Sequence, residues 1–255
     1  MPTFQATDGI EIYYQRWEGE SDLPPVLLHH GFIADGRTNW VLPGVVAALT
    51  ATGRRVVAID ARGHGLSGKP SDPVFYGESR MAEDVSTLLD LLGIDRVDVA
   101  GYSMGAVVSL LLATRDQRIR RLAIGGIGSA VVELGGVDTR VIPAEAVREA
   151  FQADDPTGIR HPAAAGFRAF VDAVGGDRAA LAAQAAAVHA EPIPLETITV
   201  PTLLVAGRDD ALATRPELLA KALPNARLAV IDGDHLGAVR EPAFTRELLA
   251  FLNTP

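Results

Sequence analysis

The sequence predicts an α/β fold built on a mostly parallel, eight-stranded sheet with helices on both faces. Short apolar runs that are typical of strands alternate with longer segments of helical period, as in parallel strands joined by crossover helices. Most of the expected strands also end at a glycine-containing loop. With 48% hydrophobic residues in 255 positions, the chain is long enough to bury one large core around a single sheet.

The first two strands are expected to pair with each other at one edge of the sheet. Residues 4–6 and 11–17 are β-rich runs that flank Asp8-Gly9, a dipeptide typical of tight hairpin turns. Because a short hairpin joins antiparallel neighbours, this edge should be the antiparallel part of the sheet.

Six further strands are expected to be mostly parallel, because longer helical segments separate them along the chain. They span about residues 26–29, 55–59, 97–100, 122–127, 202–206 and 227–231. The expected helices span about residues 39–52, 81–92, 106–114, 215–223 and 242–252. In the second of these helices, Met81, Val85 and Leu88 recur at helical spacing, which predicts one buried stripe.

Residues 128–191 interrupt this alternation of strands and helices. The stretch is rich in alanine and has helical patterns near residues 143–151, 163–174 and 177–189, without convincing strands between them. We interpret it as a helical insertion in a core formed by residues 1–127 and 192–255.

The composition argues against several classes of function. A net charge of −9 without any basic run is atypical of a nucleic-acid partner. No apolar stretch reaches the roughly 18 residues of a membrane span, and residues 1–6 lack signal-peptide features, so a cytoplasmic protein with no membrane partner is expected. Cysteine is absent, and neither a metal nor another cofactor is needed to explain the motifs. A small-molecule substrate is the expected partner, and the oligomeric state stays open.

A Gly-x-Ser-x-Gly motif at residues 101–105 predicts a serine nucleophile, Ser103. The motif lies between the expected strand 97–100 and the expected helix 106–114, where it forms a sharp, strained turn that exposes the serine. The five-residue pattern by itself also fits an ordinary serine in a glycine-rich turn. The strand before it and the helix after it favour the nucleophile.

The partners of such a serine should follow as an acid and then a histidine, on loops after later strands. His235 is the only histidine after the last expected strand and is the candidate general base. Two carboxylates, Asp209 and Asp210, follow the strand at 202–206. We assign Asp210 to orient His235, because this role needs one buried, aimed carboxylate. Asp209 is then expected to be solvated or to hold the turn.

Acyl transfer also needs hydrogen-bond donors for the developing oxyanion, and two main-chain amides usually supply them. Met104, the residue after the nucleophile, should supply one donor. The loop after the strand at 26–29 contains His30-Gly31-Phe32, which places the amide of Phe32 to supply the other. Gly31 permits the close approach of this loop.

Four motifs, in this order, resemble those of the α/β-hydrolase superfamily over nearly the whole chain. They are His30-Gly31-Phe32, Asp60-Ala61-Arg62-Gly63-His64-Gly65-Leu66-Ser67, the serine motif at 101–105, and Gly207-Arg208-Asp209-Asp210 with Asp234-His235. The resemblance implies the α/β-hydrolase fold. It also implies that Asp60, Arg62 and His64 hold one another and the neighbouring loops in place.

The resemblance further implies that an insertion after the sixth strand covers the active site as a cap. Residues 128–191 lie at that position, and His161 and His189 within them are expected to face solvent. Gly31 and Trp40 are candidate substrate contacts, with Trp40 lining the acyl pocket beside Phe32 or, equally, packing the start of its helix.

The leading hypothesis for function is hydrolysis of a small, fairly apolar carboxylic ester or lactone through an acyl-Ser103 intermediate. Ser103 stands where the dehalogenases and epoxide hydrolases of this fold have an aspartate, so the chain is more similar to small esterases, lactonases, carbon–carbon bond hydrolases and haloperoxidase-like perhydrolases. One alternative is a carbon–carbon bond hydrolase or a lyase-type member of the fold. Another is a ligand-binding receptor that reuses the pocket without catalysis. The substrate and its acyl-chain length are not determined by the sequence.

Overall fold

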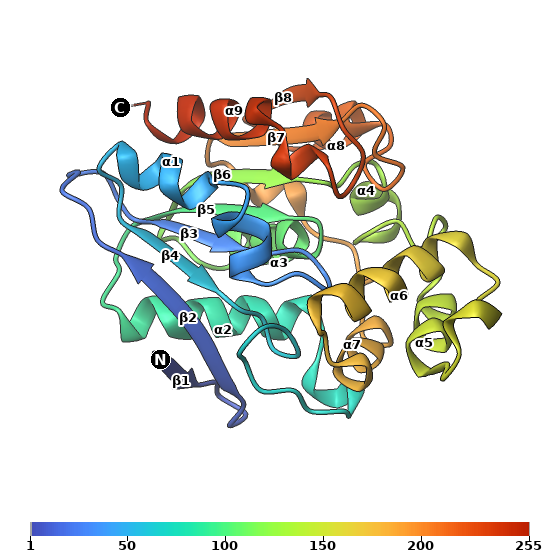
Figure 1. The fold of residues 1–255 in the computed structure, drawn as a ribbon. Helices are drawn as coiled ribbons and strands as arrows, with labels where there is room; N and C mark the ends of the chain where they lie inside the picture. The colour runs from blue at the N-terminus through green and yellow to red at the C-terminus, as the bar shows by residue number, and fades with distance from the viewer. Residues whose placement is uncertain (1, 255) are drawn as a thin grey trace.

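An eight-stranded sheet forms the centre of the computed structural model, which describes residues 2–254 (Figure 1). The strands are β1 (Thr3–Gln5), β2 (Glu11–Trp17), β3 (Val26–His29), β4 (Val56–Ile59), β5 (Val97–Tyr102), β6 (Ile119–Gly125), β7 (Thr202–Gly207) and β8 (Ala226–Ile231). Their order across the sheet is β1-β2-β4-β3-β5-β6-β7-β8. β2 is antiparallel to both of its neighbours, whereas the pairs from β4 to β8 are parallel. The predicted fold class, including the antiparallel hairpin at one edge, is confirmed.

Helices cover both faces of the sheet, because successive strand residues point to opposite sides. They are α1 (Val45–Ala51), α2 (Glu78–Leu91), α3 (Met104–Ala113), α8 (Pro216–Ala222) and α9 (Pro242–Leu252). Leu27 of β3 belongs to the core layer that includes the buried residues of α2, α3 and α8. The next residue, Leu28, belongs to the layer with α1 and α9. The central strands are therefore apolar on both faces, as buried parallel strands require.

The helix predicted over residues 39–52 differs from the structure. The chain forms a short π-helical segment, Arg37–Val41, and then the separate helix α1. Gly44 lies between them with φ 86°, a left-handed conformation that interrupts a right-handed helix. Hydrophobic spacing continues across this break, which is why the periodicity alone suggested one helix.

The segment between β6 and β7 is helical, and no strand occurs in residues 128–191, all of which the structure describes. Its helices are α4 (Ala130–Leu134), α5 (Ala144–Gln152), α6 (Pro162–Val174) and α7 (Arg178–Ala185). Helices α5, α6 and α7 pack around a small core of their own, which Ile33 from the loop after β3 joins. They lie beside the carboxyl ends of the central strands (Figure 1). The helix predicted at 177–189 ends early, at Ala185, and α4 was not predicted.

Five short helical turns complete the secondary structure, namely Arg37–Val41, Pro73–Phe75, Pro156–Gly158, Leu195–Thr197 and Ala238–Arg240. Within residues 2–254, none of the helices combines the length and the apolar character needed to cross a bilayer.

Candidate active site

Ser103 occupies the sharp turn between β5 and α3, with φ 53° and ψ −115°, a strained conformation for a residue with a side chain. The two glycines of the motif are needed because the chain passes itself closely here. A Cβ on Gly101 would lie 2.2 Å from the carbonyl oxygen of Gly105. A Cβ on Gly105 would lie 2.2 Å from the carbonyl oxygen of His29. Both distances are far below van der Waals contact, so the turn tolerates only glycine at these positions.

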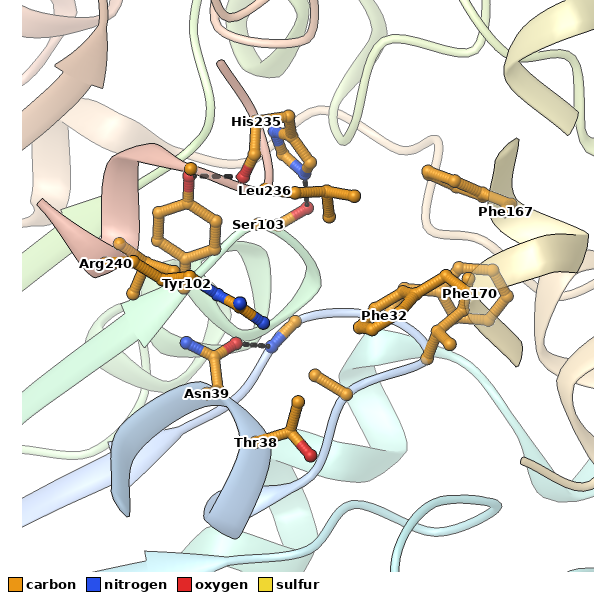
Figure 2. A pocket seen from close by; sticks show the side chains of 15 residues that line it. Phe32, Thr38, Asn39, Tyr102, Ser103, Phe167, Phe170, His235, Leu236 and Arg240 are labelled. Carbon is orange, nitrogen blue, oxygen red and sulfur yellow. Dashed lines mark hydrogen bonds between the residues drawn. The ribbon is translucent and has the colours of Figure 1, made fainter. Parts of the chain in front are cut away.

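The structure brings the three predicted catalytic side chains into one hydrogen-bonded series. Nε2 of His235 lies 2.9 Å from Oγ of Ser103 (Figure 2). Nδ1 of the same ring lies 3.0 Å and 2.9 Å from the two carboxylate oxygens of Asp210. A carboxylate only accepts, so the proton sits on Nδ1, and Nε2 is left to accept the hydroxyl of Ser103. This is the arrangement in which an imidazole can act as a general base.

The two adjacent aspartates have different surroundings. Asp210 is buried, and its Oδ1 also accepts the main-chain N–H groups of Leu212 and Ala213, at 2.9 Å and 3.2 Å. These bonds fix the direction of the carboxylate toward His235. Asp209 is exposed, and its main-chain N–H donates to the carbonyl of Gly233. The geometry thus places Asp210, and not Asp209, against the imidazole.

Tyr102, which the sequence did not single out, holds the loop that carries His235. Its hydroxyl donates a 2.7 Å hydrogen bond to the main-chain carbonyl of His235. Its ring packs against that of His235, with centroids 5.6 Å apart, and edge-on against Phe244. Burial, together with the charges of Asp210 and Asp234, raises the pKa of Tyr102 well above its ordinary value. The hydroxyl therefore stays protonated and keeps donating.

The loop after β3 lies directly beside Ser103. A Cβ on Gly31 would lie 3.3 Å from Cβ of Ser103. The N–H of Gly31 donates to Oδ1 of Asn39, at 2.9 Å, so this group is already engaged. Within residues 2–254, by contrast, no acceptor takes the main-chain N–H of Phe32 or of Met104. These two amides are the free donors that the sequence assigned to the oxyanion.

A cluster of three buried histidines supports the same loop. His30 receives the N–H of Ala61 on Nε2, at 2.9 Å, so its Nδ1 donates to the carbonyl of Gly31, at 2.8 Å. Burial lowers the pKa of His29 to about 3. Burial and the proximity of His30 also lower the pKa of His64 well below its ordinary value. The rings of His29 and His64 are therefore expected to be neutral throughout the ordinary pH range, consistent with packing and not with proton transfer.

The motif at residues 60–67 ties loops together. The carboxylate of Asp60 accepts the N–H groups of Gly36 and Leu66, both at 2.9 Å. The buried guanidinium of Arg62 pairs with Asp84 and Asp8, at 2.7 Å and 2.6 Å. His64 donates from Nδ1 to the carbonyl of Arg62. These contacts match the supporting role that the resemblance implies.

Two cavities meet at Ser103. The larger, of about 340 Å³, has His235 in its wall and is called the His235 cavity. The smaller, of about 60 Å³, has Glu78 in its wall and is called the Glu78 cavity. Ser103, Phe32 and Phe167 line both. Ser103 therefore stands at the junction of two spaces, where a group that attacks the middle of a substrate would have to stand.

Aromatic side chains form one wall of the His235 cavity. Phe167 and Phe170 of α6 gather there with Phe32, across the cavity from Tyr102 and Arg240 (Figure 2). No motif in the sequence indicates a role for Phe167, Phe170 or Arg240. Their spacing along the chain gave no signal, because α6 meets the loop after β3 only in the folded molecule.

Trp40, His161 and His189 line neither the His235 cavity nor the Glu78 cavity. Trp40 is fully buried in the core beside Phe244, with ring centroids 6.3 Å apart, and lines neither cavity, so of its two expected roles the structure supports packing. His161 is partly buried and caps the start of α6 by accepting the N–H of Ala164, so the expectation that it faces solvent is not met. His189 is partly buried, and its main-chain N–H donates to Glu78, so the expectation that it faces solvent is not met.

The chain is similar to several hydrolases in sequence and in fold. Residues 24–133 match the family model described as alpha/beta hydrolase fold. A hydrolase from Pseudomonas aeruginosa PA01 superposes with a TM-score of 0.79 and 30% identity, over 99% of this chain and 98% of that one. The enol-lactonase from Burkholderia xenovorans LB400 gives a TM-score of 0.80 and 26% identity, over 99% and 100% of the two chains.

A further relative matches over a shorter region. The 2-hydroxy-6-oxo-2,4-heptadienoate hydrolase of Pseudomonas putida is 35% identical over 116 residues. That alignment spans 45% of this chain and 41% of the relative, less than half of each.

Proposed function

Because the chain belongs to the α/β-hydrolase superfamily, we propose that it is a serine hydrolase that cleaves a small, fairly apolar carboxylic ester or lactone. The observation that carries this proposal is the series Ser103–His235–Asp210, hydrogen-bonded at 2.9 to 3.0 Å, at the junction of two cavities. The relatives named above are hydrolases, and one is an enol-lactonase.

The reaction proceeds through an acyl-enzyme. As Oγ of Ser103 attacks the carbonyl carbon, Nε2 of His235 takes the hydroxyl proton, and Asp210 stabilises the imidazolium. The carbonyl oxygen becomes an oxyanion, which the N–H groups of Phe32 and Met104 bind. Collapse of this intermediate expels the leaving oxygen, and His235 returns the proton to it. Water then repeats the sequence on the acyl-serine, releasing the acid and restoring the Ser103 hydroxyl.

The two cavities take different parts of the substrate. The leaving oxygen must receive its proton from His235, so the leaving group lies in the His235 cavity. The Glu78 cavity contains Met104 but not His235 in its wall, and it takes the acyl group. Its volume of about 60 Å³ is much smaller than the about 340 Å³ of the His235 cavity, so the acyl group is the smaller part of the substrate.

We assign residues 128–191 the role of a cap over this site. Phe167 and Phe170 of α6 line the His235 cavity, and Gln184 of α7 lines the Glu78 cavity. The segment thus contributes walls to both spaces around Ser103. Its side chains set which leaving groups and acyl groups fit.

The Ser103→Ala variant tests the proposal. We expect kcat on 4-nitrophenyl acetate to fall by about 10³- to 10⁶-fold, as when other serine nucleophiles are removed. Asp210→Asn should also be strongly impaired, while the matched control Asp209→Asn, a change to the exposed neighbouring carboxylate, should keep wild-type turnover. Near-native turnover of Ser103→Ala would refute the esterase assignment.

A second candidate is hydrolysis of a carbon–carbon bond. The observation that favours it is the similarity to 2-hydroxy-6-oxo-2,4-heptadienoate hydrolase over 116 residues. Turnover of a short acyl ester and of a ring-fission dienoate, measured with the same preparation, separates the two. A kcat/KM that strongly favours the ester supports the leading proposal, and the reverse order supports the second.

A further inference from the structure

Glu78 is a buried acid in the wall of the Glu78 cavity, and the mechanism above leaves it without a role. It is the first residue of α2, and only 2% of its surface is exposed. Besides Ser103, two acidic or hydroxyl side chains, Asp138 and Thr139, line the same cavity. The carboxylate of Asp138 is bound on both oxygens by the guanidinium of Arg140, at 2.8 Å and 2.7 Å. The carboxyl of Glu78 has no such partner.

The hydrogen bonds of Glu78 leave part of its carboxyl unused. Oε2 accepts the main-chain N–H of His189, at 2.7 Å, and Oε1 lies 3.4 Å from Nε2 of Gln184, a long contact. No cation pairs with Glu78 in the part of the chain that the structure describes. A carboxyl group offers about four acceptor positions, so capacity remains.

The remaining walls of the cavity are apolar, which makes this polar end distinctive. They include Val137, Ile142, Ala144, Val147, Ala185, Val188 and Leu212. A buried carboxyl without a cation carries a free-energy cost that a leucine in its place would avoid. Burial raises the pKa of Glu78 to about 7, so near neutral pH the carboxyl exists in both protonated and ionised forms.

We propose that Glu78 is a specificity-determining residue that selects short acyl groups bearing a hydroxyl near their free end. This rests on the esterase function proposed above, in which the acyl group enters the Glu78 cavity. A hydroxyl both donates and accepts, so it bonds the protonated carboxyl and the carboxylate alike. A plain alkyl end leaves the unused acceptor positions of the carboxyl unfilled when water is displaced, which penalises binding.

The test compares two esters of equal chain length, 4-nitrophenyl 3-hydroxybutanoate and 4-nitrophenyl butanoate. For the wild-type enzyme we expect kcat/KM to favour the hydroxyacyl ester by about 10-fold or more, since a hydrogen bond to a charged group contributes about 1.5 to 3 kcal/mol, which is a factor of about 10 to 100. In Glu78→Leu this ratio should fall to about 1. Glu78→Gln, which conserves size and hydrogen bonding, should retain part of the preference.

The matched control is Glu83→Gln, a change to an exposed carboxylate on the same helix, which should keep the wild-type ratio. A purely structural role of Glu78 would lower the activity on both esters together and leave the ratio unchanged. The proposal is overturned if the wild-type ratio is 1 or less, a result that needs no variant, or if Glu78→Leu keeps the preference. Either result leaves the proposed esterase function of Ser103 intact. That function would instead be refuted by near-native esterase activity of Ser103→Ala.

Discussion

Asn39 lies outside the series Ser103–His235–Asp210, but its side chain holds the loop that lies beside Ser103. Its Oδ1 holds the N–H of Gly31, and the next amide along the chain is the free donor of Phe32. We therefore expect Asn39 to act as a positioning residue for the proposed oxyanion site. Its own main-chain N–H donates to the carbonyl of Asp35, which anchors it on the short π-helical segment.

Removing this anchor should impair the chemical step more than binding. In Asn39→Ala we expect kcat on 4-nitrophenyl acetate to fall by about 10- to 100-fold, less than the loss of an oxyanion donor itself, with KM changed by less than about threefold. Steady-state kinetics measure this split. Asn225→Ala, a change to an exposed asparagine, is the control and should behave as wild type. An unchanged kcat in a folded Asn39→Ala protein would contradict the assigned role.

Glu78 also makes the free energy of unfolding depend on pH. Its pKa in the folded protein, about 7, lies above the ordinary value of 4.5, so the fold favours the protonated form. The stability that this form contributes is complete below about pH 4.5 and is lost as the pH rises through 7, with a total on the order of 3 kcal/mol. Glu78→Gln should remove this loss. Melting temperatures of both proteins from pH 5 to 8 should therefore diverge, with the variant gaining relative to wild type.

The titratable groups near Glu78 should not obscure this effect. Burial lowers the pKa of His189, and the hydrogen bonds from Arg140 lower that of Asp138. Both pKa values are thus shifted away from neutral pH, where Glu78 titrates. Parallel pH profiles for wild type and Glu78→Gln would contradict the assigned ionisation.

The sequence could predict Ser103, Asp210 and His235 because each follows a recognisable strand and their order along the chain is diagnostic. It could not predict Glu78 as a lining residue, since its hydrogen bond to the N–H of His189 joins positions 111 apart in sequence. Tyr102 lies inside the serine motif, yet its hydrogen bond reaches a loop 133 residues away. Such roles arise from the fold and have no local signature.

The contact between α3 and β3 depends on a single glycine. Gly105→Ala would place a methyl group 2.2 Å from the carbonyl oxygen of His29. The main chain of the packed strand can move away only at a large cost in free energy. We expect a loss of about 3 kcal/mol in the free energy of unfolding, at the upper end for overpacking. Gly166→Ala in α6 is the matched control, because nothing lies within 4 Å of its Cβ position.

Gly166→Ala should instead raise the free energy of unfolding, because alanine in a helix interior is favoured over glycine by about 1 kcal/mol. Urea denaturation of the two variants beside wild type measures both effects. Equal stability of Gly105→Ala and wild type would show that the turn around Ser103 adapts, and that glycine is not required at position 105.

Strands and helices were easier to predict than their ends. The last helix begins at Pro242 and ends at Leu252, as expected, because a proline starts it and a clear apolar stripe runs through it. The helix predicted at 39–52 was wrong because the conformation of Gly44, not its neighbours' hydropathy, decides where α1 begins. The early end of α7 at Ala185 was missed for a related reason, since alanine-rich sequence continues beyond it.

The assembled molecule explains why the three proposed catalytic residues, which are distant in sequence, meet. Parallel strands place their carboxyl ends at one edge of the sheet, so the loops after β5, β7 and β8 bring Ser103, Asp210 and His235 together. The alternation of strands and helices predicted this parallel sheet. The order of the strands, and the cavities beside Ser103, depend on how the crossovers and the β6–β7 segment pack in three dimensions. No single stretch of sequence contains that information.

The proposed reaction requires Ser103 to be an activated nucleophile. Labelling with a fluorophosphonate, followed by mass spectrometry of the intact protein and its peptides, tests this requirement. We predict one adduct per chain, located on Ser103, with parallel loss of esterase activity and no adduct on Ser103→Ala. A wild-type protein that stays unlabelled, or that loses activity through an adduct on another residue, would contradict it.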